Sequence, residues 1–241
     1  MGFIEVEYGM IIPDFWNMDV LFVPQDHPAR ELWDSLYLEV GEDKSVDGNI
    51  MKRIKEAHEN GGSTGSEGWR YTWNEDEARK MVLRSHSTPN TIRYLSENPD
   101  KPVKVFSIGK CFRRDPFTFK HSPEFYQVEG IIMEEGANLA MLMGILNEFY
   151  TRLGFKKVGF KPSYFPFTEP SLEVVVEFKG RMFELAGAGI FRPEVTEPWE
   201  IKWPVLAFGG GLERLVMVLE NIKDIRMFYT NDLEWLRSRH I

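Results

Sequence analysis

Polar and charged side chains gather in the segment Val103–Met133, at spacings that would place several of them on one face of a sheet. Two runs rich in β-branched and aromatic residues flank a charged connection, which predicts a β-hairpin. Because alternate residues of a strand share a face, Phe125, Gln127 and Glu129 would lie in a row on the second strand. On the first strand, a row of small side chains would lead to Arg113. A face with an aromatic ring, an amide, a carboxylate and a guanidinium is suited to hold a polar ligand rather than to fill a core.

A second arginine follows a run of three glycines near the end of the chain. Residues 205–208 are apolar, residues 209–211 are glycines, and apolar residues then recur at helical spacing from Leu212 to Leu219. Arg214 would lie in the first turn of this helix, where free N–H groups and the helix dipole favour anions. A guanidinium adds a fork for phosphate oxygens. The segment indicates an anion site, but a flexible strand-to-helix turn with an exposed arginine explains the same residues equally well.

Length and composition bound the class of protein. A chain of 241 residues with 43% hydrophobic residues can bury a full core, and one domain over residues 1–241 is the simplest interpretation. The net charge of -8 argues against nucleic-acid binding through bulk charge. A group of cations nonetheless surrounds the predicted hairpin, and a phosphate-facing patch and an ordinary solvated rim explain it equally well. The group consists of Lys101, Lys104, Lys110, Arg113, Arg114 and Lys120.

The sequence also bears on location and redox state. No apolar run approaches the length of a membrane span, and no basic region followed by an apolar stretch opens the chain as in a signal peptide. The single cysteine, Cys111, excludes an intramolecular disulfide, and its apolar neighbours favour a buried inert thiol over a nucleophile. We therefore expect a protein of the reducing cytoplasm that does not contact a membrane.

Apolar spacing and chain-breaking residues predict the main elements. Helices are expected over residues 49–59, 75–82, 88–97 and 139–153, and a flexible loop over residues 60–69. Strands are expected in the hairpin and over residues 83–87, 158–164, 172–178, 181–190 and 205–208. Strands outnumber helices and most connections are typical of hairpins. The pattern therefore predicts the α+β class, with a mainly antiparallel sheet flanked by helices.

Further segments occur in a fixed order around the two arginine motifs. They are Val-Pro-Gln-Asp-His-Pro-Ala-Arg at 23–30, Leu-Arg-Ser-His-Ser-Thr at 83–88, Phe-Pro-Phe-Thr-Glu-Pro-Ser at 165–171 and Gly-Ala-Gly-Ile-Phe-Arg-Pro-Glu-Val at 187–195. The hairpin and the glycine run resemble motifs 2 and 3 of class II aminoacyl-tRNA synthetases. The whole set resembles the catalytic α-subunit of the phenylalanyl-tRNA synthetases of archaeal type. This resemblance extends from residue 1 to residue 237, and several ordered motifs are far more specific than one glycine pattern.

The resemblance implies a fold and a reaction. The fold would be the class II catalytic core. The reaction would join the carboxylate of phenylalanine to the α-phosphate of ATP, release pyrophosphate and, in the full enzyme, transfer the acyl group to tRNA(Phe). Such chemistry depends on positioning and charge neutralisation rather than on a protein nucleophile. ATP and Mg²⁺ would be required, but the metal ligands are not assigned, because Glu169 and Glu173 are explained equally well as strand-edge acids and as groups on the magnesium side.

For ATP, the resemblance implies roles for five residues. Arg113 would bind the α-phosphate and the substrate carboxylate, and with Arg214 it would carry the catalysis. Phe125 would stack on adenine, with Arg214 on the other face of the base and near the γ-phosphate. His121 would reach the outer phosphates. Asp115 would meet the amino group of adenine, although it is one methylene shorter than the glutamate usual in the family.

For the amino acid, the resemblance implies a pocket with a charged end and an aromatic end. Gln127 and Glu129 would hold the ammonium group, and Phe165 and Phe167 would grip the substrate ring edge to face. Plain packing beside Pro166 also explains the two phenylalanines. The pocket would be completed by His86, Thr88, Ala188 and Ala207, with the glycines next to the alanines leaving room for the ring.

The resemblance also implies parts that residues 1–241 do not include. In the family, a long motif-1 helix that builds the subunit interface precedes the segment matching residues 1–7, and an N-terminal extension and a β-subunit accompany the core. We therefore expect a catalytic core that charges tRNA weakly by itself and pairs with a β-subunit or a second copy. Two alternatives stay open: a ligase of the same scaffold that activates another amino acid, and a non-catalytic module that binds an amino acid or a partner.

Overall fold

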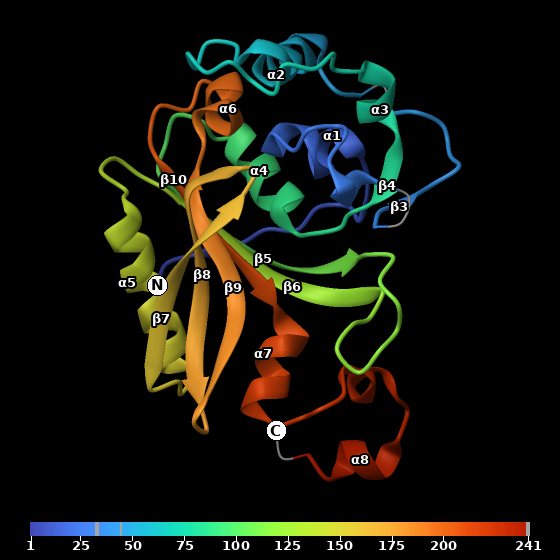
Figure 1. Cartoon of the computed structure of the whole chain (residues 1–241), viewed down its shortest axis with the longest axis vertical. Helices are drawn as coiled ribbons and strands as arrows, with labels where there is room; N and C mark the ends of the chain where they lie inside the picture. Colours follow the sequence, from blue (N-terminus) through green and yellow to red (C-terminus); the bar gives the residue numbers. More distant parts are fainter. Residues whose placement is uncertain (32–33, 44, 240–241) are drawn as a thin grey trace.

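The computed structural model describes residues 1–31, 34–43 and 45–239, and its largest element is a seven-stranded sheet (Figure 1). The strand order is β1-β5-β6-β10-β9-β8-β7, with β1 parallel to β5 and each other neighbouring pair antiparallel. The strands are β1 (Ile4–Glu5), β5 (Val103–Phe112), β6 (Glu124–Met133), β7 (Lys157–Phe165), β8 (Thr168–Phe178), β9 (Arg181–Phe191) and β10 (Val205–Gly211). Because helices flank this mainly antiparallel sheet, the predicted α+β class is confirmed.

A smaller antiparallel sheet and the helices complete the architecture. The small sheet has the order β2-β4-β3 and contains β2 (Ile11–Pro13), β3 (Leu36–Tyr37) and β4 (Met81–Leu83). The α-helices are α1 (Asp14–Asn17), α2 (Gly48–Asn60), α3 (Glu75–Arg79), α4 (Thr88–Ser96), α5 (Leu139–Arg152), α6 (Pro193–Thr196), α7 (Leu212–Leu219) and α8 (Leu233–Arg237). The 3-10 helices are η1 (Asp19–Leu21), η2 (Pro28–Arg30), η3 (Glu197–Trp199) and η4 (Ile225–Tyr229).

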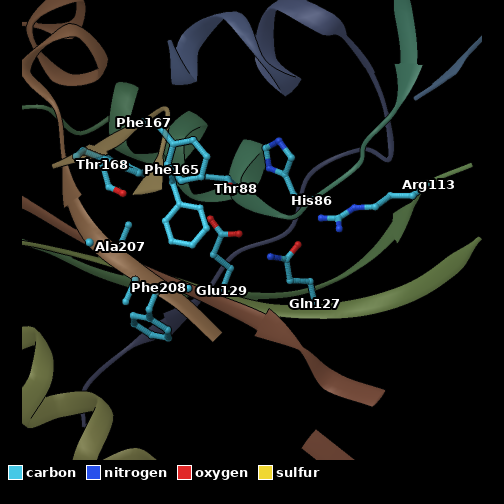
Figure 2. A pocket seen from close by; sticks show the side chains of 15 residues that line it. His86, Thr88, Arg113, Gln127, Glu129, Phe165, Phe167, Thr168, Ala207 and Phe208 are labelled. Carbon is cyan, nitrogen blue, oxygen red and sulfur yellow. The ribbon is translucent and has the colours of Figure 1, made fainter. Parts of the chain in front are cut away.

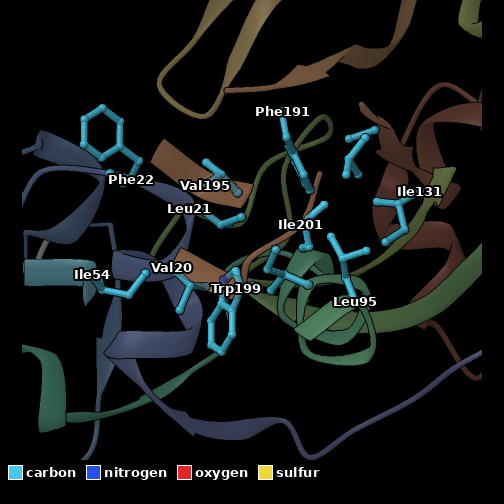
Figure 3. Packing of buried hydrophobic residues seen from close by; sticks show 14 of the residues in the cluster. Val20, Leu21, Phe22, Ile54, Leu95, Ile131, Phe191, Val195, Trp199 and Ile201 are labelled. Carbon is cyan, nitrogen blue, oxygen red and sulfur yellow. The ribbon is translucent and has the colours of Figure 1, made fainter. Parts of the chain in front are cut away.

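Hydrophobic clusters cover both faces of the large sheet. Ile131 and Met133 of β6 belong to the cluster shared with α1, α2 and α4, part of which is shown in Figure 3. Ile132 points to the other face and joins the cluster shared with α5 and α7. This alternation follows from the two-residue period of a strand. Burial on both faces fixes the strand register, because a slip of one residue would exchange the two sets of side chains.

Capping residues account for the ends of the two longest helices. Asp47 accepts hydrogen bonds from the N–H groups of Asn49 and Ile50 at the start of α2, and Gly61 ends the helix with φ 83°. Asn138 caps α5 through the N–H of Met141. The helices predicted over residues 49–59, 88–97 and 139–153 are therefore confirmed within one residue at each end.

The prediction was wrong between residues 75 and 87. The helix expected to reach residue 82 ends at Arg79, and the strand expected over residues 83–87 is instead β4, Met81–Leu83. Val82 is fully buried between β2 and β3, so tertiary pairing decides its conformation. Arg84 then leaves the small sheet: its N–H bonds to Met10 and its carbonyl accepts the N–H of Phe112, which links the two sheets.

Two strand boundaries near the glycines and the prolines also differ from the prediction. Residues 209–211 do not form a turn, because β10 continues through Gly211 and pairs with β6 as far as Gln127. Strand β8 begins at Thr168 rather than at residue 172, and the register shift between Thr168 and Ser171 accommodates Pro170. In both places, residues that are typical of turns are held in strands by their neighbours.

Other expectations stand as follows. Cys111 is fully buried, and burial raises the pKa of its thiol to about 12, which confirms an inert thiol. Within the described part of the chain, none of the helices has the length and apolar character needed to cross a bilayer. The single domain over residues 1–241 stays a prediction, and residues 32–33, 44 and 240–241 lie outside the described residues.

Gly130 of β6 provides a test of the packing. A Cβ at this position would lie 2.5 Å from the ring of Phe208 and 3.0 Å from the carbonyl oxygen of Val105. We expect Gly130→Ala to lower the free energy of unfolding by about 1–3 kcal/mol, because the strand must shift to admit a methyl group. Urea denaturation measures the change.

Gly144 supplies the matched control for this substitution. It lies inside α5, where a Cβ would meet no atom within 4 Å. Gly144→Ala should stabilise the protein by about 0.5–1 kcal/mol, because alanine is the better helix former. Equal effects of the two substitutions would contradict the packing described for β6.

Candidate functional site

The site is built on the middle of β6 and the glycines of the neighbouring strand. Gly209 pairs with Glu129, and Gly211 pairs with Gln127. A Cβ on Gly209 would lie 3.1 Å from Nε2 of Gln127 and 3.2 Å from Oε2 of Glu129. The absence of a side chain at Gly209 therefore leaves room for the row of polar side chains on β6.

The first cavity lies over this row and has a volume of about 270 Å³. Figure 2 shows side chains from the sheet, from the β7–β8 connection and from the start of α4 converging on it. It is lined by all eight residues predicted for the amino acid, namely His86, Thr88, Gln127, Glu129, Phe165, Phe167, Ala188 and Ala207, and by Arg113. The structure thus brings the predicted residues together, and their roles toward a ligand stay predictions.

Glu129 is the buried charge-bearing group of this cavity. It is 4% exposed, and its carboxylate accepts hydrogen bonds from the hydroxyls of Ser87 at 3.4 Å and Thr91 at 3.5 Å. Burial raises its pKa to about 7, although the hydroxyls of Thr88, Ser87 and Thr91 and the charge of Arg84 act in the opposite direction. These long bonds leave the carboxylate able to pair with a cation that enters the cavity.

Gln127 and Arg113 are held in place by the chain segment before α4. The N–H of Ser87 donates to Oε1 of Gln127 at 3.1 Å. Nε of Arg113 donates to the carbonyl of Ser85 at 3.0 Å, and the N–H of Ser85 in turn bonds to Oδ1 of the buried Asn17. One short segment therefore orients both the amide and the guanidinium.

His86 lies between these contacts and faces the cavity. Burial and the positive charge of Arg113 lower the pKa of its imidazole to about 3, so the ring is neutral at physiological pH. Its Nδ1 is buried without a hydrogen-bond partner within residues 1–31, 34–43 and 45–239. The ring also forms a hydrogen bond with the backbone of Asn17, which gives His86 a structural contact, and a contact of the ring with a ligand stays a prediction.

The aromatic end of the first cavity is formed by the connection between β7 and β8. Phe165 ends β7 and Phe167 follows it in the turn, with ring centroids 6.0 Å apart and planes inclined by 18°. A Cβ on Gly187 would meet the ring of Phe165, and one on Gly189 would meet Thr168, so these glycines open the space beside the rings. Ala188 pairs with Phe208, and its side chain packs in the cluster on the other face of the sheet.

The second cavity adjoins the first and has a volume of about 300 Å³. The two cavities share Arg113, Gln127 and Phe165. All five residues predicted for ATP line the second cavity, namely Arg113, Asp115, His121, Phe125 and Arg214. The guanidinium of Arg113 lies 5.1 Å from the ring centroid of Phe125, so these two groups already contact each other without a ligand.

The cationic side chains near the second cavity fall into two groups, those that line the cavity and those that are paired with acids. Arg113 and Lys120 line it, whereas Lys104 and Lys110 form ion pairs with Glu134 and Glu124. The first pair supports a phosphate-facing patch, and the second pair belongs to the solvated rim.

Glu173 lines the second cavity, together with Glu184 of the next strand and Asp115, and it accepts a hydrogen bond from Ser163. Carboxylate oxygens suit Mg²⁺, which typically uses one or two of them together with substrate phosphates and water. Among the described residues, no group of three or more metal-ligating side chains is assembled. The donors fit a metal that arrives with a nucleotide rather than a preformed metal centre.

Sequence reasoning missed some features of the site. The small-residue face of β5 is not an open floor: a Cβ on Gly109 would lie 2.5 Å from a guanidinium nitrogen of Arg84, which covers that face with Asn90. Several lining residues were also not proposed, although most of them fall inside the quoted motifs. They are Thr168, Phe191, Gly209, Glu184 and Glu213.

Comparison with known proteins adds an independent result. The family described as tRNA synthetases class II core domain (F) matches residues 1–239. The chain is 48% identical over 241 residues to the phenylalanine–tRNA ligase alpha subunit of Archaeoglobus fulgidus, which covers 99% of this chain and 50% of that protein. For the subunit of the same name from Methanothermobacter thermautotrophicus, the identity is 50% over 242 residues, with 99% and 47% covered. The chain thus spans about half the length of these curated relatives.

The antiparallel sheet, the hairpin with its arginine, the glycine strand that leads into α7 and the family match agree with one another. The chain therefore belongs to the family of class II tRNA synthetase core domains.

Proposed function

We propose that this chain activates phenylalanine with ATP to form the aminoacyl-adenylate. The observation that carries the proposal is the sharing of Arg113 by two adjoining cavities, one with a buried carboxylate and aromatic rings and one with further cations. A carboxylate and an α-phosphate that react with each other must both meet a neutralising group at the point of contact. Arg113 occupies that boundary, and the names of the relatives support phenylalanine and tRNA as substrates.

The proposed step balances without a protein nucleophile. A carboxylate oxygen of phenylalanine attacks the α-phosphorus of ATP, a new C–O–P linkage forms, and the bond to the β-phosphate oxygen breaks to release pyrophosphate. Mg²⁺ bound with the nucleotide would neutralise phosphate charge, with Glu173 and Glu184 of the second cavity as candidate ligands. The residues hold the reactants in line, which is the main source of catalysis in such transfers.

Each side chain has a stated part in this proposal. Glu129, with Gln127 beside it, holds the ammonium group, and Arg113 holds the carboxylate and the α-phosphate. Phe125 stacks on adenine opposite Arg214. The remaining contacts are Asp115 to the adenine amino group, His121 to the outer phosphates, His86 and Thr88 at the amino-acid end, and Phe165, Phe167 and Ala207 around the ring. The small Ala188 borders the same cavity, but its side chain packs on the other face of the sheet.

The partners and location belong to the same proposal. In a second step, a hydroxyl at the 3′ end of tRNA(Phe) attacks the acyl carbon and AMP leaves, within an assembly that includes a β-subunit or a second copy of the chain. A location in the cytoplasm agrees with the single buried thiol. The relatives favour this activity over both alternatives, a paralogue for another amino acid and a non-catalytic module.

The substrate is tested by amino-acid-dependent ATP–pyrophosphate exchange over the twenty amino acids. We expect the highest exchange with phenylalanine and clearly less with leucine, because an aromatic ring can make edge-to-face contacts with Phe165 and Phe167, which line the cavity. A maximum with a charged or small amino acid would remove phenylalanine from the proposal. Exchange with none of the twenty would favour the non-catalytic module.

Arg214 tests the nucleotide end. We expect Arg214→Ala to weaken ATP binding by about 1.5–3 kcal/mol, the range for hydrogen bonds to charged groups, as measured by calorimetry. The matched control is Arg152→Ala, which removes a solvent-exposed arginine from α5 and should leave ATP affinity unchanged. Unchanged ATP binding by the Arg214 variant would show that this arginine has no phosphate role.

Glu129 makes phenylalanine binding depend on pH. Its raised pKa of about 7 means that the carboxyl must lose a proton before it pairs with an ammonium group. Affinity should therefore rise about tenfold per pH unit below pH 7 and level off above it. Arg84, Arg113 and His86 face the same region, and the lowered pKa of His86, about 3, keeps its ring neutral throughout this range.

Calorimetry in buffers of pH 5.5–8.5 measures the dependence. In Glu129→Gln, binding should be weaker and flat over the same range, because the amide does not titrate. A slope that survives this substitution would assign the pH dependence to another group.

A further inference from the structure

Glu213 ties the start of helix α7 to strand β6. It is 7% exposed, and both carboxylate oxygens accept the N–H of Tyr126, at 2.8 and 3.0 Å. This N–H lies one residue beyond the last β6–β10 pair, Gln127 with Gly211, so no carbonyl of β10 is available to it. The carboxylate takes the place of the strand partner.

The neighbours of this contact are the two groups proposed to enclose adenine. Glu213 precedes Arg214 in α7, and Tyr126 follows Phe125 in β6. The hydrogen bonds between Glu213 and Tyr126 therefore set the separation of the two chain segments that carry Phe125 and Arg214. A change in this separation would change the width of the slot between them.

Tyr229 of η4, in the segment that follows α7, provides a further hydrogen bond to Glu213. Its hydroxyl donates to Oε1 of Glu213 at 2.6 Å, the shortest of the three bonds that the carboxylate accepts. A carboxylate that is nearly buried needs such donors, because water reaches it poorly. Without the hydroxyl, the N–H of Tyr126 is the one remaining donor to Glu213 among the described residues, so the carboxylate is held less firmly.

The same segment also holds the connection between β5 and β6. The N–H of Ile225, at the other end of η4, donates to the carbonyl of Phe119 at 3.0 Å. Phe119 lies in the loop that carries Asp115 and His121, and Figure 1 shows the C-terminal segment after α7 reaching this loop. At one end of η4 Ile225 lines the second cavity, and at the other end Tyr229 contacts Glu213, which also lines it.

We propose that Tyr229 is a positioning residue for ATP, acting through Glu213 on the slot between Phe125 and Arg214. The proposal rests on the function proposed for the second cavity. It goes beyond that function because Tyr229 touches neither reactant, and because it assigns a role to the segment that follows α7. The width of the slot between Phe125 and Arg214 should affect the affinity for ATP and not the affinity for phenylalanine, because Phe125 and Arg214 line the second cavity and not the first.

The test compares Tyr229→Phe with Tyr8→Phe. Both substitutions remove a tyrosine hydroxyl that donates to a glutamate, at 2.6 Å to Glu213 and at 2.8 Å to Glu97, and Tyr8 lies outside both cavities. Calorimetry should show ATP bound about 3- to 10-fold more weakly by Tyr229→Phe, the equivalent of one hydrogen bond, with phenylalanine affinity unchanged. Tyr8→Phe should change neither affinity.

Two outcomes of this titration would overturn the proposal. One is an ATP affinity of Tyr229→Phe equal to that of the wild type. The other is an equal loss for ATP and phenylalanine, which would indicate a general structural defect. In a Glu213→Gln background the effect of Tyr229→Phe on ATP affinity should be smaller, because both substitutions act on the same contact. Full additivity of the two effects would also contradict the proposal.

Amide hydrogen exchange keeps the two proposals distinguishable. If the wild-type chain binds no ATP, the proposed function fails, and exchange alone then decides the role of Tyr229. Residues 115–126 should exchange faster in Tyr229→Phe than in the wild type and in Tyr8→Phe. Equal exchange in the three proteins would overturn the contact-based argument itself.

Discussion

Gly209 of β10 stands opposite Glu129 of β6, and this pairing decides where the molecule can hold a ligand. A side chain at Gly209 would occupy the space directly above the carboxylate and the amide of Gln127. The register that creates the pairing is fixed from outside the site, because Ile131, Ile132 and Met133 alternate between two buried clusters. The polar row on β6 is therefore a consequence of how the apolar end of the same strand packs.

A buried carboxylate is tolerated in this position because hydroxyl groups surround it. Ser87 and Thr91 donate to Glu129 over long distances, and the start of α4 brings both of them to the sheet. The bonds are too weak to restore the usual pKa, which burial raises to about 7. A group in this state gains from the arrival of a cation, so the same features that cost folding free energy would favour the proposed binding of an ammonium group.

The two cavities are connected by the segment of residues 84–87 rather than by the sheet alone. Arg84 is fully buried and links the small sheet, the large sheet and Asn90, while Ser85 and Ser87 orient Arg113 and Gln127. Arg113 is thereby held at the boundary between the first cavity and the second cavity. In the proposed reaction, which uses no protein nucleophile, positioning of this kind would supply most of the rate enhancement.

The sequence by itself determined the class of fold, the long helices and the thirteen residues predicted for ATP and the amino acid, all of which line the two cavities. Strand alternation placed Phe125, Gln127 and Glu129 on one face, and the ordered motifs indicated the other side chains. Tertiary structure decided what local pattern does not encode. Residues 209–211 are held in a strand by β6, residues 81–83 pair between two short strands, and Arg84 rather than a ligand covers the small residues of β5. The contact of Tyr229 with Glu213 joins residues that local periodicity does not relate. In each case the partner lies in a different segment of the chain, so the free energy that fixes the conformation comes from contacts that exist only in the folded protein.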